Sequence, residues 1–162
     1  MEGRKTKQAP RAILVFGAPS SGKTTFSENF AKRFNMPCYD MDDLAKRHDL
    51  NRQKVLLLVE QLAKTGCNLV IQGGLSTEQD RNEIRSILKI AGYNPFLIWI
   101  QTDVATIRMR LKMRLRSEAK AKAEYENCVR NMEAPSESES VIVLSGKHTF
   151  ETQLKHVLHQ LI

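Results

Sequence analysis

The chain has 162 residues, of which 41% are hydrophobic and 27% are charged, and this predicts one globular domain with a core of its own. No apolar run approaches the roughly 20 residues that span a bilayer, so no membrane partner is expected. The net charge of +7 comes from two segments. Residues 1–11 hold four basic residues against Glu2, and residues 108–122 hold seven against Glu118.

The first basic segment predicts a disordered tail over residues 1–10, followed by a single domain over 11–162. The three cysteines are widely spaced and form no CxxC pattern, which fits reduced thiols in a cytoplasmic protein.

Short apolar runs alternate with helical stretches along the rest of the chain. The runs predict five strands, at residues 12–16, 37–40, 68–72, 96–100 and 141–145. Helices are expected at 23–34, at 41–66 with a break near 49–51, at 76–91, as a long basic lid over about 104–131, and at 149–161. Apolar strands separated by helices predict a three-layer α/β fold: a five-stranded parallel sheet with helices on both faces.

Polar and glycine-rich residues follow the predicted strand ends, where ligands bind in such folds. These segments are Gly17–Thr25, Asp40–Asp43, Gly73–Gly74, Thr102–Asp103 and Ser145–His148.

Residues 17–24, GAPSSGKT, match the phosphate-loop pattern G-x-x-x-x-G-K-[ST] between a predicted strand and a predicted helix. Successive backbone N–H groups of such a loop form an anion-binding concavity, and the helix N-terminus adds positive potential. Lys23 is expected to bridge the β- and γ-phosphates, and Thr24 to supply a hydroxyl to Mg²⁺. The sequence therefore predicts ATP and Mg²⁺ as cofactors. The predicted nucleotide-binding residues of this loop are Gly17, Ala18, Pro19, Ser20, Ser21, Gly22, Lys23, Thr24 and Thr25.

Three carboxylates, Asp40, Asp42 and Asp43, follow the second predicted strand. If this strand lies beside the first, its carboxyl end faces the γ-phosphate. One carboxylate can then hold Mg²⁺ or its waters, and another can accept the proton of a substrate hydroxyl. Alternatively, Asp42 or Asp43 caps the helix that follows.

The order of these motifs over residues 11–162 resembles the small P-loop kinases of the nucleoside/shikimate-kinase group. NMPCYDMDDLAKRH is similar to the shikimate-kinase region with its D-x-D motif, whereas residues 73–114 look closer to polynucleotide-kinase-like, AAA-type ATP-binding proteins. The resemblance implies Asp42 as the base and Asp40 as a magnesium-shell carboxylate. Ala45 stands where polynucleotide kinases have an arginine, and Gln72 where shikimate kinases have the first of three glycines.

Arg110 and Arg114 are four residues apart and share one helix face. The resemblance implies Arg110 near the nucleotide base and Arg114 as a lid arginine that stabilises the transferring phosphoryl group. A solvated basic helix face is the alternative. Lys147 and His148 are expected to border the adenine; alternatively, Gly146 only turns the chain and the residue after His148 caps the last helix.

Arg81 and Arg85 share a face of the helix after Gly73–Gly74. They either reach an anionic acceptor or lie on an ordinary surface.

Together these patterns favour an ATP-dependent kinase that transfers the γ-phosphoryl group to a hydroxyl of a small molecule or a nucleic-acid end, with Lys23, Asp42 and Arg114 as catalytic residues. One alternative is a P-loop NTPase or switch without an acceptor, which the lack of an acid after Gln72 disfavours. The other is an ATP-linked nucleic-acid-binding protein, which the basic segments favour and the aromatic content of 6% disfavours. Neither the acceptor nor the oligomeric state has a readable signature.

Overall fold

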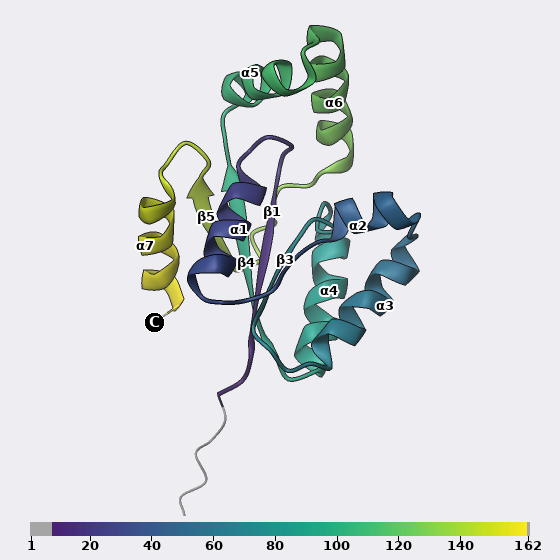
Figure 1. Ribbon diagram of the computed structural model, residues 1–162, viewed down its shortest axis with the longest axis vertical. Coiled ribbons are helices and arrows are strands. Elements are labelled where there is room, and N and C mark those ends of the chain that lie inside the picture. The colour runs from purple at the N-terminus through teal and green to yellow at the C-terminus, as the bar shows by residue number, and fades with distance from the viewer. Residues whose placement is uncertain (1–7, 162) are drawn as a thin grey trace, which may run out of the picture.

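The computed structural model describes residues 8–161 (Figure 1), so most of the predicted basic tail lies outside the described residues. Within that range, five parallel strands form one sheet in the order β2-β3-β1-β4-β5. This confirms the predicted α/β fold. The strands are β1 (Arg11–Gly17), β2 (Cys38–Asp40), β3 (Leu69–Gln72), β4 (Asn94–Gln101) and β5 (Val141–Ser145).

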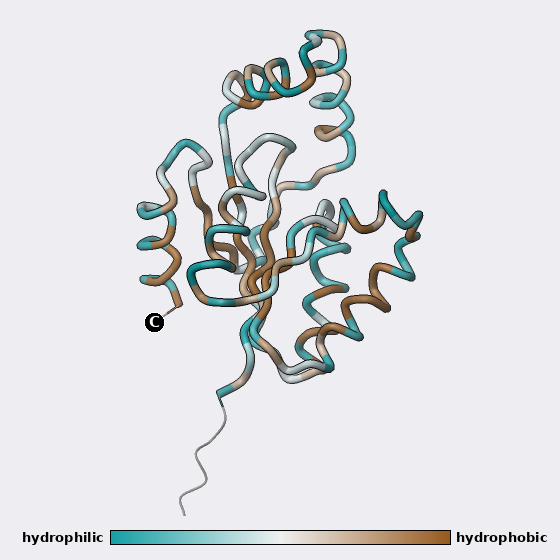
Figure 2. Tube along the Cα trace, in the orientation of Figure 1, coloured by the Kyte–Doolittle hydropathy of each residue, from teal (hydrophilic) through white to brown (hydrophobic). Residues whose placement is uncertain are grey.

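Helices cover both faces of the sheet (Figure 1). Side chains of successive strand residues point to opposite faces, so strands that are apolar throughout present two apolar faces for helices to bury. Ala12, Leu14 and Phe16 of β1 pack in a cluster with α3 and α4, whereas Ile13 and Val15 pack in a second cluster with α1 and α7. Figure 2 shows the hydrophobic residues concentrated along the central strands. The helices are α1 (Lys23–Arg33), α2 (Met41–His48), α3 (Arg52–Ala63), α4 (Glu78–Ile90), α5 (Val104–Leu115), α6 (Glu118–Asn131) and α7 (Phe150–Leu161).

Local hydrogen bonds set several helix boundaries that the sequence predicts. Asp49 ends α2 in a left-handed conformation, and the Asn51 side chain accepts from the backbone N–H of Lys54 to begin α3. Thr77 begins α4 with a reciprocal capping box. Asp103 caps α5 by accepting from the backbone N–H of Thr106 at 2.9 Å.

The condition that the second strand lies beside the first is not met, and the prediction of one long basic helix is wrong. Strand β2 does not lie beside β1, because it pairs with β3, which pairs with β1. The long basic helix is broken in two: Arg116 adopts a left-handed conformation (φ 51°) and Ser117 caps α6. The lid is thus a helical hairpin.

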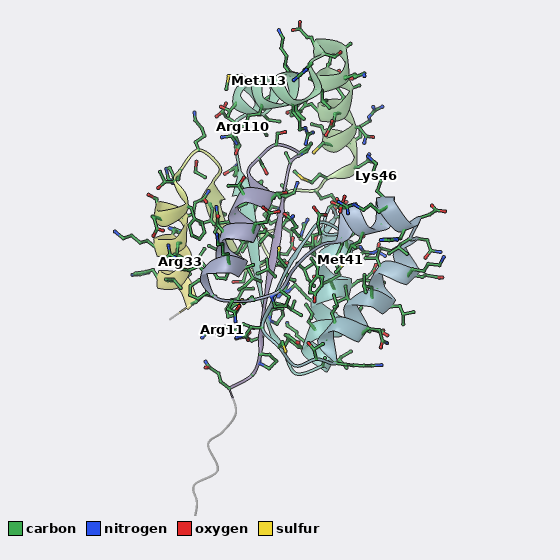
Figure 3. All side chains as sticks on the ribbon, in the orientation of Figure 1. Arg11, Arg33, Met41, Lys46, Arg110 and Met113 are labelled. Atoms are coloured by element: carbon green, nitrogen blue, oxygen red, sulfur yellow. The ribbon has the colours of Figure 1, made fainter. Side chains whose placement is uncertain are left out.

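The lid hairpin, α5 and α6, stands beyond the carboxyl ends of the strands (Figure 1). Its small apolar cluster is built on buried Ile107, Leu111 and Ala121 and contacts Ala18 of the phosphate loop. Figure 3 shows Arg110 on the side of α5 that faces the sheet and Met113 on its exposed side. In the part of the chain that the structure describes, no helix is long and apolar enough to cross a membrane.

Candidate active site

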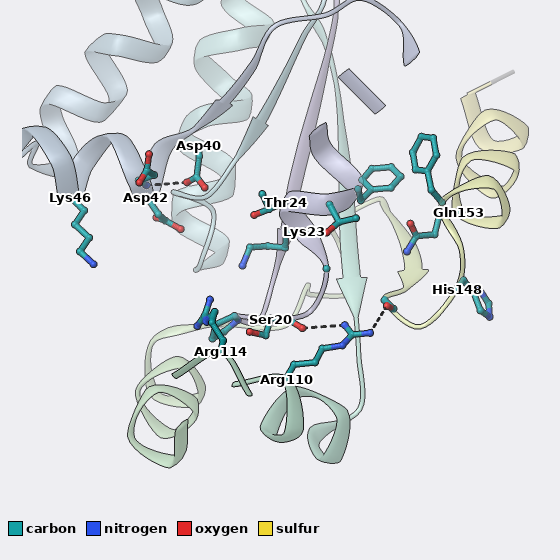
Figure 4. A pocket seen from close by; sticks show the side chains of 17 residues that line it. Ser20, Lys23, Thr24, Asp40, Asp42, Lys46, Arg110, Arg114, His148 and Gln153 are labelled. Carbon is teal, nitrogen blue, oxygen red and sulfur yellow. Dashed lines mark hydrogen bonds between the residues drawn. The ribbon is translucent and has the colours of Figure 1, made fainter. Parts of the chain in front are cut away.

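A pocket of about 660 Å³ opens at the carboxyl ends of the strands (Figure 4). The phosphate loop, the carboxylates after β2, the lid and the loop after β5 all contribute to it. The pocket brings together most of the residues that the sequence predicts. Its lining residues are Pro19, Ser20, Gly22, Lys23, Thr24, Thr25, Phe26, Asp40, Asp42, Asp43, Lys46, Arg110, Arg114, Gly146, His148, Phe150 and Gln153.

The phosphate loop has the backbone conformation of an anion-binding concavity. Ser20 (φ 59°) and Gly22 (φ 106°) are left-handed, and the backbone N–H of Ser21 donates to the carbonyl of Ala18. Residues other than glycine rarely adopt the φ angle of Gly22. Within the described residues no side chain caps the N-terminus of α1, so its first N–H groups stay available for a phosphate.

The Lys23 ammonium folds back onto the loop. Its Nζ donates to the carbonyl of Gly17 at 2.9 Å and to that of Ala18 at 3.3 Å. Burial lowers the pKa of Lys23, and the nearby Asp42 carboxylate partly offsets this. The Lys23 ammonium is thus held by two neutral backbone carbonyls. Negatively charged phosphate oxygens are stronger acceptors and can replace them.

The Asp40 carboxylate is held by two donors. Its Oδ1 accepts from the backbone N–H of Asp43 at 3.0 Å, which makes Asp40 the N-cap of α2. Its Oδ2 accepts from Nε2 of Gln72 at 3.1 Å. The capping role that the sequence offered to Asp42 or Asp43 therefore belongs to Asp40.

The Asp42 carboxylate rests on the two glycines after β3. Its Oδ1 accepts from the backbone N–H of Gly74 at 3.0 Å. A Cβ atom at Gly73 would lie 2.7 Å from Oδ2 of Asp42, and Gly73 is also left-handed (φ 74°). These glycines let the loop approach Asp42 closely. Although β3 separates β1 from β2, Asp42 and Lys23 line the same pocket.

The donor set fits a magnesium ion. The pocket presents the Thr24 hydroxyl and the Asp40 carboxylate, and Mg²⁺ prefers oxygen ligands, a few from protein and the rest from phosphates and water. Among residues 8–161, no group of three or more His, Cys, Asp or Glu side chains forms a self-contained metal site. The buried Oε1 of Gln72, next to Asp40, has no hydrogen-bond partner within the described structure, which fits a polar site that expects a further donor such as water.

Two arginines of the lid point into the pocket. Arg110 donates to the carbonyl of Ser20 at 3.2 Å and to that of Gly146 at 3.1 Å, so it bridges the phosphate loop and the loop after β5 (Figure 4). Arg114 pairs with Glu124 of α6 at 2.5 Å.

Other lid cations are engaged within the hairpin. The guanidinium of Arg108 lies 5.1 Å from the centre of the Tyr125 ring, and Lys112 pairs with Glu118. Several cations of the basic cluster are therefore paired within the hairpin, although their side chains stay exposed to solvent.

The two residues of the loop after β5 that are predicted to border the adenine lie in different surroundings. His148 lines the pocket, whereas Lys147 does not and pairs with Asp103 at 3.3 Å. Phe150 and Gln153 also line the pocket, and sequence reasoning missed both. Their only sequence signal is their place in the first turn of the helix after the glycine loop.

Arg81 neither lines the pocket, where it could contact an anionic substrate, nor lies on the surface. Its side chain is fully buried, pairs with Glu139 at 2.7 Å, and lies 4.5 Å from the centre of the Phe16 ring. It also donates to the carbonyls of Leu75 and Glu133. Arg81 thus fastens the chain that returns from the lid to the sheet, and the partly buried Arg85 does not line the pocket.

The fold and the loop between β1 and α1 define the class: this is the P-loop NTPase fold in the form seen in small kinases. A sugar kinase from Janibacter sp. HTCC2649, solved without ligand, superposes with a TM-score of 0.73 at 19% identity, over 94% of each chain. A gluconokinase from Sinorhizobium meliloti 1021 gives 0.72 at 14% identity, over 96% of this chain and 93% of the other. The APS kinase of Mycobacterium tuberculosis, solved with AMPPNP and APS, gives 0.72 at 15% identity, over 94% and 98%.

A family model described as an AAA domain matches residues 13–135, so the chain belongs to the AAA domain family. No curated protein matches the sequence. The resemblance to small P-loop, AAA-type kinases is therefore confirmed.

Proposed function

We propose that this protein is an ATP-dependent phosphotransferase that moves the γ-phosphoryl group of ATP to a hydroxyl of a small molecule. The observation that carries the proposal is one pocket that joins Lys23 and Thr24 of the phosphate loop, the Asp42 carboxylate and the lid residue Arg114. The kinases with the same fold support it, since their names include a sugar kinase and a gluconokinase.

The nucleotide occupies the side of the pocket that the phosphate loop and the loop after β5 form. Its phosphates bind the backbone N–H groups of the loop that follows Pro19, and Lys23 exchanges its two carbonyl partners for β- and γ-phosphate oxygens. Arg110, His148, Phe150 and Gln153 border the base.

The acceptor hydroxyl lies opposite, near Asp42. Asp42 accepts the proton of the hydroxyl, and the N–H of Gly74 keeps its carboxylate in place for this. Arg114 stabilises the negative charge on the transferring oxygens. Thr24 and Asp40 would hold Mg²⁺, which when bound neutralises charge on the β- and γ-phosphates.

The engaged cations favour a small-molecule acceptor over a nucleic acid. Nucleic-acid binding relies on cations that are free to neutralise phosphates. In the lid, Arg108 lies over the Tyr125 ring and Lys112 pairs with Glu118. Outside the lid, Arg52 of α3 is engaged as well, because it donates to the carbonyl of Gly74 and pairs with Asp80.

The test is transfer of labelled γ-phosphate from ATP·Mg²⁺ to pools of sugars, hydroxy acids and nucleosides, and to a 5′-hydroxyl oligonucleotide. We expect label in one small-molecule pool. Asp42→Asn should lower transfer by about 10²–10⁴-fold, the usual contribution of a general base, and leave ATP affinity nearly unchanged. Asp49→Asn is the matched control, because Asp49 ends the same helix away from the pocket and Asn tolerates its left-handed conformation.

Two results would contradict the proposal. Label in the oligonucleotide alone would select a polynucleotide kinase. Release of free phosphate at a rate that no acceptor changes would select an NTPase without acceptor.

A further inference from the structure

Gln72 ends β3 at the point where the sheet meets the pocket. In the parallel register it lies between Val15 of β1 and Asp40 of β2. Its side chain is 3% exposed. Because strand side chains alternate between faces, Gln72 shares a face with Val70, whose cluster includes α1. Thr24 lies in the first turn of that helix.

One half of the Gln72 amide holds Asp40. Its Nε2 donates to Oδ2 of Asp40 at 3.1 Å. An ionised carboxylate only accepts hydrogen bonds, so the amide must turn its NH₂ group, and not its oxygen, toward Asp40. With the backbone N–H of Asp43 on the other oxygen, the Asp40 carboxylate is fixed from two elements, β3 and α2.

The other half of the amide is unused. Oε1 of Gln72 is buried and has no hydrogen-bond partner among residues 8–161. Oγ of Ser27, which lies one helical turn after Thr24 on α1, is also buried and has no hydrogen-bond partner among residues 8–161. Native proteins rarely leave buried polar atoms without a hydrogen-bond partner. Where no protein atom is within reach, an ordered water molecule is the usual partner.

We propose that Gln72 is a positioning residue for magnesium: its NH₂ group holds the Asp40 carboxylate at the pocket that Thr24 also lines, where these two residues would hold the ion. This inference rests on the proposed function. Walker-type NTPases use an aspartate for the metal. An acid at residue 72 would place a second negative charge beside Asp40, which a neutral amide avoids.

The test measures metal affinity, not activity. Mn²⁺ serves as the probe, and free Mn²⁺ is followed by electron paramagnetic resonance in the presence of protein saturated with AMPPNP. We expect Gln72→Met to weaken Mn²⁺ binding about 10-fold, the lower end of the range for residues that orient metal ligands. AMPPNP affinity in EDTA should stay the same. Gln101→Met is the matched control, since Gln101 ends β4 and its side chain is exposed.

A double-mutant cycle with Asp40→Asn separates positioning from simple packing. If Gln72 acts through Asp40, Gln72→Met should weaken Mn²⁺ binding further by less than about threefold in the Asp40→Asn background. The same 10-fold loss in both backgrounds would overturn the proposal, as would wild-type affinity in Gln72→Met.

If Gln72→Met does not fold, Gln72→Asn replaces it. Its amide is one methylene too short to reach Asp40, so the same loss is expected, and wild-type affinity would overturn the proposal. Failure of the wild-type protein to bind AMPPNP would instead refute the proposed function. Binding of Mn²⁺·AMPPNP by the wild type and the Gln72 variants alike refutes only the role of Gln72.

Discussion

The sheet body and the lid hairpin are stabilised differently. The body buries two large apolar clusters, one on each face of the sheet. The lid has three buried residues of its own, Ile107, Leu111 and Ala121, and adds exposed ion pairs such as that between Lys112 and Glu118. Exposed pairs contribute little to stability. The lid, which carries Arg110 and Arg114, therefore has a small core and depends on its attachments to the body.

Those attachments include polar contacts at both ends of the lid, beside the apolar contact with Ala18. Arg110 joins α5 to the phosphate loop through two backbone carbonyls. At the other end of the lid, Arg81 holds the returning chain through Glu139 and the carbonyl of Glu133. A lid fastened at both ends but weakly cored can open and close as a unit.

The largest expected effect comes from removing the attachment at Arg81. Arg81→Met leaves the Glu139 carboxylate buried without its partner, which should lower the free energy of unfolding by about 3–5 kcal/mol. Urea denaturation measures this loss. Arg130→Met, an exposed arginine near the end of α6, is the control and should stay within about 0.5 kcal/mol of wild type. A loss below about 1 kcal/mol for Arg81→Met would mean that the buried pair does not fasten the lid.

A pair of leucine truncations sharpens the comparison between body and lid. Leu88 in the body and Leu111 in the lid are both fully buried. Leu88→Ala should lower the global free energy of unfolding by about 2–5 kcal/mol. Leu111→Ala should act locally, because a small core opens by itself, and should speed amide hydrogen exchange mainly in residues 104–131.

Hydrogen exchange followed by mass spectrometry distinguishes the two. Equal acceleration throughout the sheet in Leu111→Ala would show that lid and body unfold as one cooperative unit.

The smallest effect is a pH dependence at the start of the lid. The hydrogen bonds from Thr106, chiefly its backbone N–H, lower the pKa of Asp103 from 3.8 to about 2. A lowered pKa in the folded state stabilises the protein above the unfolded pKa, and this stabilisation is lost as the pH falls through the folded value. The melting temperature of wild type should therefore exceed that of Asp103→Ala at pH 6, and the difference should shrink between pH 4 and pH 2. A difference in melting temperature that stays constant over this range would show that the stabilisation by Asp103 does not depend on the charge of its carboxyl group.

Much of the site was predictable because it is local in the chain. The phosphate loop is eight consecutive residues, and its conformation depends on Gly22 and on the strand and helix that flank it. The breaks at residues 49–51 and 103 depend on side chains that bond to backbone three residues away. In contrast, no local signal distinguished buried Arg81 from an exposed arginine, because its partner Glu139 lies 58 residues further along the chain.

The sequence by itself determined the strands, the anion-binding loop and the order of the motifs, because each depends on periodicity and on hydrogen bonds between near neighbours. Only the tertiary structure decided that β3 separates β2 from β1, that the lid folds back at Arg116, and that Gln72 holds Asp40. These features depend on strand pairing and packing between distant segments, in which each candidate partner competes with others of similar local sequence.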